Sequence, residues 1–180
     1  ECDCLLQVTA KAKSEAAAEE MLRPVMEHVC QRLGEYVYGV DVENLEQGVF
    51  AALTARPMTF ATAESCTGGE IAKRFTDLPG ASRFFIGGLV TYKNDAKTRL
   101  LGIDPELIRQ KSAVSYEVAQ AMAEGVRTRL GADIGIGVTG IAGPLGDGLH
   151  EVGTVFVSMA VEGQTYVREL HMGTYRTRSF

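Results

Sequence analysis

The chain lacks several features that would assign it to a common class. No stretch of its 180 residues approaches the roughly 20 apolar residues of a membrane span, and no signal peptide is recognisable. It has no Walker lysine motif, no G-x-G-x-x-G turn after a strand and no H-E-x-x-H zinc motif. With a net charge of −5, it has no excess of Lys and Arg for a broad nucleic-acid surface. We expect neither membrane insertion nor nucleic-acid binding. The net charge is still compatible with a small basic pocket for one phosphate.

Cysteine is scarce, with four residues at Cys2, Cys4, Cys30 and Cys66. Cys2 and Cys4 have a spacing typical of neither zinc fingers nor redox C-x-x-C motifs, and no second Cys/His pair completes a metal site. We therefore expect reduced, unpaired thiols, no metal and a cytoplasmic protein.

Residues 1–40 predict a small partial α+β module with little core of its own. Residues 5–12 alternate as a strand would, Ser14 can cap a helix to about Leu33, and Gly34 can end it. The following EYVYG predicts a short strand or turn. The chain opens with Glu1 rather than Met, inside the expected strand, so we expect a fragment or a processed form.

Residues 41–180 predict a second domain of the α/β class. Asp41 can cap a helix to about Leu53, with Leu45, Val49 and Ala52 also on its buried stripe. Strands are expected at 58–63, 84–92, 134–139, 154–161 and 165–172, with helices after Gly69, at 95–111 and at 115–130. This order predicts a three-layer α/β/α sandwich with a mixed, mainly parallel sheet that ends in a hairpin.

The segment TFATAESCTGGEIAKRF places Ser65 between a short strand and a helix. Ligands of open α/β sheets bind beyond the carboxyl ends of the strands, where the first N–H groups of a helix also point. Ser65 can therefore be a nucleophile, with its own and the following N–H groups as an oxyanion hole. Alternatively, Ser65 or Thr67 simply caps the helix.

The segment GGLVTYKNDAKTRLLG brings Tyr92 and Lys97 to the same sheet edge. Only about one Lys in 2,500 is neutral at pH 7 at the reference pKa, whereas a pKa of about 8 raises that fraction to about a tenth. Burial, or repulsion from Lys93, would make Lys97 a general base for a Ser–Lys pair. The alternative is a solvated helix lysine.

The segment ADIGIGVTGIAGP is a glycine-rich strand that ends at Thr139 and Gly140. These two residues suit contact with a phosphate or ribose, whereas Gly135 and Gly137 favour close packing of a helix on the strand. The three histidines, His28, His150 and His171, are all remote from Ser65 in the sequence, so a His-based triad is unsupported.

The motifs ATAESCTGG, VTYKNDAKTRLLG, AVS, GVTGIAGP and VGTVFV, in this order and spacing, resemble the CinA carboxy-terminal family, the nicotinamide-nucleotide amidases. The resemblance covers about residues 41–172. It implies hydrolysis of the carboxamide of nicotinamide mononucleotide to nicotinate mononucleotide and ammonia, within pyridine nucleotide salvage, without a metal or other cofactor.

The resemblance also implies the roles of individual residues. Ser65 would be the nucleophile, Lys97 its base, and Tyr92 would orient the pair or relay the proton. Among the substrate-binding residues, Thr67, Gly68 and Gly69 would shape the oxyanion site, and Asn94, Thr139 and Gly140 would line the nucleotide pocket. Two other interpretations stay open: a non-catalytic nucleotide-binding module, and a nucleophilic Cys66 at the helix N-terminus.

The chain departs from the family pattern in two places. The loop after Pro144 contains Leu145 and the stretch DGLH, where the family has more glycines, and GTYRTRSF replaces a final helix, so that Arg176 matches the family poorly. The first forty residues resemble a KH-like linking module, but they have no G-x-x-G loop, and RNA binding is not expected. An exposed sheet edge and a missing helix would favour a homo-oligomer.

Overall fold

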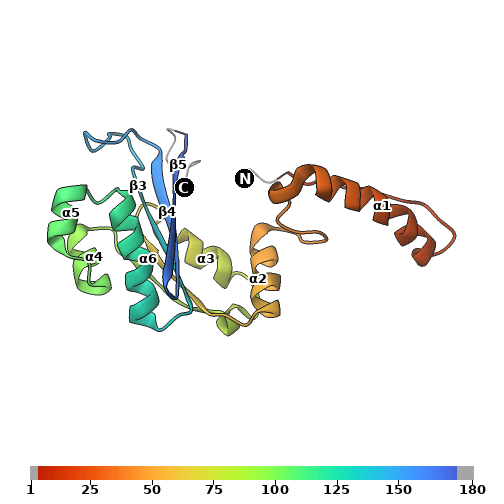
Figure 1. Cartoon of the computed structure of the whole chain (residues 1–180), viewed down its shortest axis with the longest axis horizontal. Helices are drawn as coiled ribbons and strands as arrows, with labels where there is room; N and C mark the ends of the chain where they lie inside the picture. Colours follow the sequence, from red (N-terminus) through yellow and green to blue (C-terminus); the bar gives the residue numbers. More distant parts are fainter. Residues whose placement is uncertain (1–3, 174–180) are drawn as a thin grey trace. The chain divides into compact units, whose positions relative to one another are not determined.

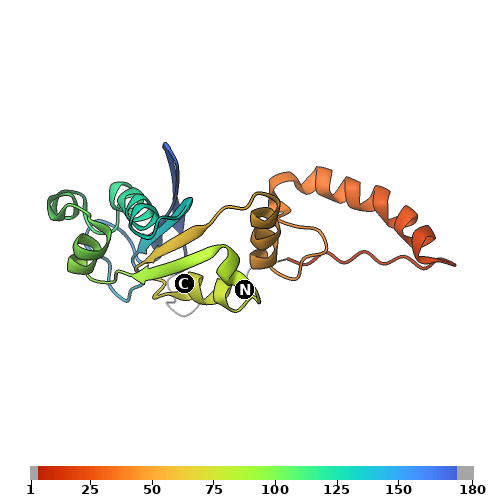
Figure 2. The same ribbon diagram turned by 90° about the horizontal axis from the view of Figure 1, so that it is seen from below.

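The computed structural model describes residues 4–173 of the chain. The chain divides into two compact units, Glu1–Val49 and Phe50–Phe180. Figures 1 and 2 show a helical first unit and a second unit built around a sheet. The final helix and Arg176 lie outside the described residues.

The first unit contains the long helix α1 (Glu15–Leu33) and a short 3-10 helix, η1 (Gly34–Tyr36). Both predicted ends of α1 are confirmed: Ser14 Oγ accepts from Ala17 N at 3.3 Å, and Gly34 ends the helix with a φ of +54°. The predicted strand at residues 5–12 is wrong, because this segment forms neither helix nor strand. An alternating sequence supplies the side chains of a strand but not its hydrogen-bonded neighbour, and no described strand pairs with this segment.

Helix α2 (Leu45–Ala55) begins later than the sequence predicts. Asp41 does not cap it and has a φ of +57°, whereas Asn44 Oδ1 accepts from Gln47 N at 2.9 Å. Of the expected buried stripe, Leu53 is buried but Leu45 is 43% exposed. Two cap-forming residues lie three positions apart, and the propensity of Asp for caps does not distinguish them.

A mixed five-stranded sheet forms the centre of the second unit, in the order β2-β1-β3-β4-β5. Strand β1 pairs in parallel with β2 and with β3, while β3–β4 and β4–β5 pair antiparallel. The sheet thus consists of a parallel half and the predicted terminal hairpin. Its strands are β1 (Phe60–Glu64), β2 (Phe85–Val90), β3 (Ile134–Gly140), β4 (Thr154–Val161) and β5 (Gln164–His171).

Helices lie on both faces of this sheet, which confirms the expected α/β class. Helices α4 (Asn94–Leu101), α5 (Pro105–Lys111) and α6 (Tyr116–Leu130) lie on one face and α3 (Glu70–Thr76) on the other (Figures 1 and 2). A 3-10 helix, η2 (Ala81–Arg83), precedes β2. Asp104 caps α5 by accepting from Glu106 N at 2.8 Å, and Ser115 caps α6 by accepting from Val118 N at 3.3 Å.

The main core lies between α6 and the parallel half of the sheet. Met122 and Val126 of α6 pack with Ala61 and Ala63 of β1, and all four side chains are fully buried. Strand β3 needs glycine under α6, because a Cβ at Gly135 would lie 2.0 Å from Ala123 O. The predicted close packing of helix on strand is therefore confirmed.

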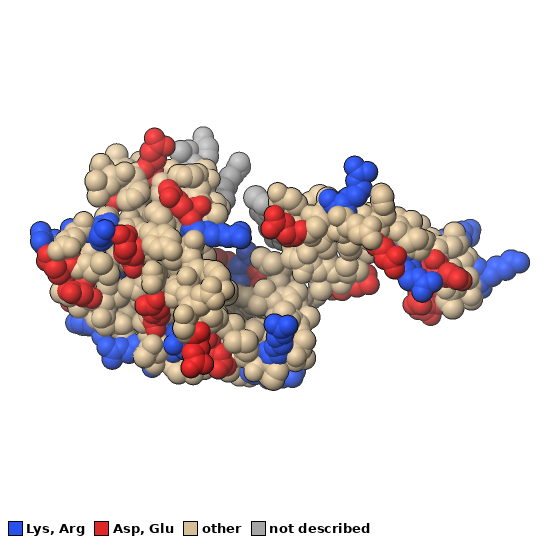
Figure 3. Space-filling view, viewed as in Figure 1, with Lys and Arg blue, Asp and Glu red and all other residues tan. Residues whose placement is uncertain are grey.

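Among the described residues, Cys4, Cys30 and Cys66 are free thiols, as expected, whereas Cys2 lies outside the described range. None of the helices within residues 4–173 is long and apolar enough to cross a membrane. Acidic and basic side chains are interspersed on the face of the molecule shown in Figure 3.

Candidate active site

The hydrogen bonds of the sheet continue past the ends of β1 and β2 and fix the residues that follow. Ser65 N donates to Val138 O at 3.0 Å, and Thr91 N donates to Glu64 O at 2.8 Å. Ser65 and Thr91 are therefore held side by side at the carboxyl edge of the parallel strands, where ligands of such sheets bind.

Lys97 reaches this edge from α4. Its Nζ lies 3.1 Å from Ser65 Oγ and 2.8 Å from Thr91 O, and Tyr92 O lies at 3.5 Å. The lysine is 1% exposed and Ser65 is 8% exposed. The interpretation of Lys97 as a solvated helix lysine is wrong.

The environment of Lys97 favours its neutral form. Burial lowers the pKa of Lys97 to about 8, and a negative charge on Cys66 acts in the opposite direction. About a tenth of the lysine is then neutral at pH 7. A neutral amine suits the geometry, because two N–H groups can donate to the Thr91 and Tyr92 carbonyls while the lone pair accepts the Ser65 proton.

Glu64, the last residue of β1, caps helix α3 from the sheet. Its carboxylate is 1% exposed and accepts hydrogen bonds from Thr62 Oγ1, Thr67 Oγ1, Gly69 N, Ile71 N and Ala72 N, at distances of 2.7 to 3.3 Å. The capping role proposed for Ser65 or Thr67 is thus taken by Glu64. The sequence reasoning missed this residue, although an acid that ends an otherwise apolar strand before a glycine turn is a usable signal.

These bonds also determine which N–H groups remain for an oxyanion. Ser65 N is used in the sheet, Gly68 N donates to Ser65 O at 3.2 Å, and Gly69 N donates to Glu64. The expectation that Ser65 contributes its own N–H is wrong. Among the described residues of the turn, Cys66 and Thr67 have N–H groups that donate to no recorded oxygen, although both act on the Cys66 sulfur.

The thiol of Cys66 does not suit a nucleophile. Burial raises its pKa to about 11, although the N–H groups of Cys66 and Thr67 and the charge of Lys97 act in the opposite direction. The thiol is therefore protonated at neutral pH, and a protonated thiol is a weak nucleophile.

The other predicted site residues take varied positions. Tyr92 is 57% exposed, Asn94 begins α4 at the surface, and Gly140 ends β3. Thr139 is 1% exposed, and its hydroxyl donates to Ala113 O at 2.8 Å. The hydroxyl of Thr139 thus ties β3 to the α5–α6 connection, and the roles of these residues toward a substrate stay predictions.

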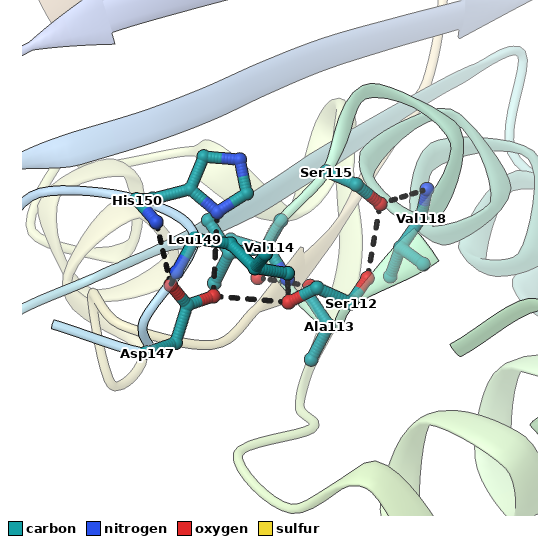
Figure 4. A network of polar contacts seen from close by, with 9 residues as sticks. Ser112, Ala113, Val114, Ser115, Val118, Asp147, Leu149 and His150 are labelled. Atoms are coloured by element: carbon teal, nitrogen blue, oxygen red, sulfur yellow. Dashed lines mark hydrogen bonds and ion pairs between the residues drawn. The ribbon is translucent and has the colours of Figure 1, made fainter. Parts of the chain in front are cut away.

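The loop after β3 is organised by Asp147 (Figure 4). Its Oδ1 accepts from Leu149 N at 2.9 Å and His150 N at 2.7 Å, while Oδ2 accepts from Ser112 Oγ at 3.0 Å and lies 3.3 Å from His150 Nδ1. Burial alone would raise the pKa of Asp147, but the hydrogen bonds outweigh burial and lower it to about 2. Asp147 therefore ties this loop to the connection between α5 and α6.

Comparison with known proteins agrees with this architecture. Residues 42–179 match the CinA C-terminal domain family, and residues 2–39 match the damage-inducible protein CinA KH domain family. The chain belongs to the CinA family. A CinA-like protein of Desulfovibrio desulfuricans is 48% identical over 183 residues, which are 100% of this chain and 43% of the relative.

Solved structures of the same superfamily share the fold. Competence damage-inducible protein A of Klebsiella pneumoniae is 34% identical with a TM-score of 0.71, over 73% of this chain and 83% of that one. The competence/damage inducible protein CihA of Agrobacterium tumefaciens is 37% identical with a TM-score of 0.71, over 78% of this chain and 87% of that one. The chain spans about two fifths of the length of the curated relatives it matches.

Proposed function

We propose that this chain hydrolyses the carboxamide of nicotinamide mononucleotide, giving nicotinate mononucleotide and ammonia. The observation that supports the proposal is the buried contact of 3.1 Å between Ser65 Oγ and Lys97 Nζ. A serine hydroxyl against a neutral lysine amine is the arrangement of Ser–Lys hydrolases. The substrate itself is proposed from the resemblance to nicotinamide-nucleotide amidases.

The proposed reaction passes through an acyl-enzyme. Ser65 Oγ attacks the carboxamide carbon while Lys97 Nζ takes the hydroxyl proton, and the N–H groups of Cys66 and Thr67 stabilise the oxyanion. The C–N bond then breaks as Lys97 returns the proton to the leaving nitrogen, which departs as ammonia. Water, deprotonated by Lys97, cleaves the Ser65 ester and releases the acid.

The remaining residues have supporting roles in this proposal. Direct contact of Lys97 with Ser65 makes a relay through Tyr92 unnecessary, so Tyr92 would orient the lysine or contact the substrate. The turn at Thr67–Gly69, with Asn94, Thr139 and Gly140, would border the nucleotide. A purely binding function is disfavoured, because it gives no role to a buried lysine held against a serine.

The decisive experiment is incubation with nicotinamide mononucleotide and detection of ammonia. Ser65→Ala and Lys97→Ala should each abolish ammonia release while the circular dichroism of the folded chain is retained. Ser82→Ala, which changes an exposed serine of η2, is the matched control and should behave as the parent chain. Parent-like turnover by the Ser65 variant would overturn the proposal. Thermal stabilisation by the nucleotide without product would indicate the binding function instead.

A further inference from the structure

Glu64 and Ser65 are adjacent in the chain but serve opposite faces of the sheet. Ala61 and Ala63 of β1 pack into the core under α6, so the alternate positions, Thr62 and Glu64, face α3. Ser65 follows on the α4 side, where its hydroxyl meets Lys97. Glu64 therefore has no contact with the proposed base, and the two groups are linked only through backbone.

The side-chain oxygens of Glu64 meet five hydrogen-bond donors. Four of its five partners, the Thr67 hydroxyl and three backbone N–H groups, close the turn from residue 65 to the first turn of α3. A carboxylate has only acceptor sites, which are all directed at donors here.

Resting on the amidase function proposed above, we propose that Glu64 is a positioning residue of the nucleophile turn. By binding Thr67 Oγ1 and Gly69 N, it holds the turn so that the N–H groups of Cys66 and Thr67 are left for the oxyanion. By binding Ile71 N and Ala72 N, it closes the N-terminus of α3 to the phosphate of the substrate. The phosphate is therefore bound elsewhere.

A positioning role for Glu64 predicts that its substitution lowers kcat more than it changes KM. Disturbing the turn weakens donors that matter most in the transition state, and loss of one oxyanion donor costs about 10²- to 10³-fold in related chemistry. Binding of the ground-state nucleotide depends less on Glu64, because Asn94, Thr139 and Gly140, which would also border the nucleotide, are not among its hydrogen-bond partners. Deprotonation of Lys97 does not depend on Glu64, since the two side chains lie on opposite faces.

The test compares Glu64→Gln with Asp104→Asn, which makes the same acid-to-amide change at the cap of a remote helix. In Glu64→Gln we expect kcat to fall about 100-fold, with KM within about twofold and the apparent pKa of kcat/KM unchanged. Asp104→Asn should leave all three unchanged. An unchanged kcat, a KM that changes alone, or a shifted apparent pKa would each overturn the positioning role.

Two additions keep the test decisive. A fluorophosphonate probe that labels Ser65 measures the reactivity of the nucleophile turn without any nucleotide. If the parent chain releases no ammonia, the proposed substrate is wrong, but labelling of Ser65 still tests the role of Glu64. We expect labelling at least tenfold slower in Glu64→Gln and parent-like in Asp104→Asn, and equal rates would contradict us. If Glu64→Gln does not fold, Glu64→Asp, which withdraws the carboxylate by one methylene, takes its place with the same criteria.

Discussion

Lys97 Nζ lies 3.1 Å from Ser65 Oγ, although 32 residues separate them in the chain. The parallel pairing of β1 with β2 brings the two segments together, and the backbone bond from Thr91 N to Glu64 O extends this pairing by one step. Thr91 O then accepts from Lys97 Nζ at 2.8 Å. The hydrogen bonds between β1 and β2 therefore position both Ser65 and Lys97.

The pH dependence of activity should follow the neutral fraction of Lys97. Its pKa is lowered by burial to about 8, and the base must be deprotonated, so kcat/KM rises with pH and levels off above about 8. The measurement is kcat/KM for ammonia release between about pH 6 and pH 10. A profile that is flat through pH 8 would contradict a lysine base.

Lys97→Met should stabilise the fold while it abolishes activity. The shift of the lysine pKa from 10.5 to about 8 corresponds to about 3 kcal/mol against the charged form, a cost that is fully present below pH 8 and lost as pH rises towards 10.5. Methionine has a similar volume, but it leaves Thr91 O without its donor, so we expect a net gain of about 1–2 kcal/mol at pH 7.

Denaturant unfolding at pH 7 measures this gain, with Lys93→Met at the exposed end of the preceding loop as the control. Repeating the comparison near pH 10.5 should reduce the difference, because the folded lysine is then neutral and the unfolded lysine has lost about half of its charge. A less stable Lys97→Met variant at pH 7 would show that burial of the amine carries no cost.

Gly137→Ala should destabilise the second unit. A Cβ at this position would lie 2.7 Å from Ala123 N and 2.6 Å from Ser158 Oγ, and backbone of α6 cannot give way cheaply. We expect a loss of about 2–3 kcal/mol in the free energy of unfolding. Gly87→Ala is the matched control, because its Cβ would make only an ordinary contact of 3.7 Å with Leu130. Equal effects of the two changes would refute the packing argument.

Asp147→Asn should loosen the loop between β3 and β4. The depressed pKa of Asp147, about 2, means that the ionised carboxylate stabilises the folded loop above pH 3.8 and that this contribution is lost as pH falls through about 2. At pH 7 the amides of Leu149 and His150 should exchange about tenfold faster by hydrogen-exchange mass spectrometry. Asp95→Asn, at an exposed pair with Arg99, should leave them unchanged.

Much of the second unit could be predicted from the sequence, because its local signals agree with its tertiary contacts. Asp104 followed by Pro105 signals the start of α5, and α6 begins at Tyr116, one residue after the expected start at Ser115. The hairpin was predictable from two apolar runs around Glu162 and Gly163. Ser65 and Lys97 were predictable as candidates, since both follow strands that end at one sheet edge.

The features that could not be predicted depend on tertiary contacts, which the local sequence does not reveal. Residues 5–12 alternate correctly but lack a neighbouring strand among the described residues. Asn44 rather than Asp41 caps α2, a choice between two similar residues. The contribution of Glu64 was hidden because it is a contact between a strand end and the next helix, with five donors that only the fold brings together.

The ladder that places Thr91 beside Glu64 has a consequence for selectivity. Because the sheet itself, rather than a closing segment, places Lys97 against Ser65, the proposed base and nucleophile are already in contact in the folded chain. Such a pair discriminates little among the carbonyl compounds that reach it, esters included. Under the proposed function, choice among them depends on the residues that border the substrate, so attempts to redirect this chain to another amide should change those residues and keep Ser65 and Lys97.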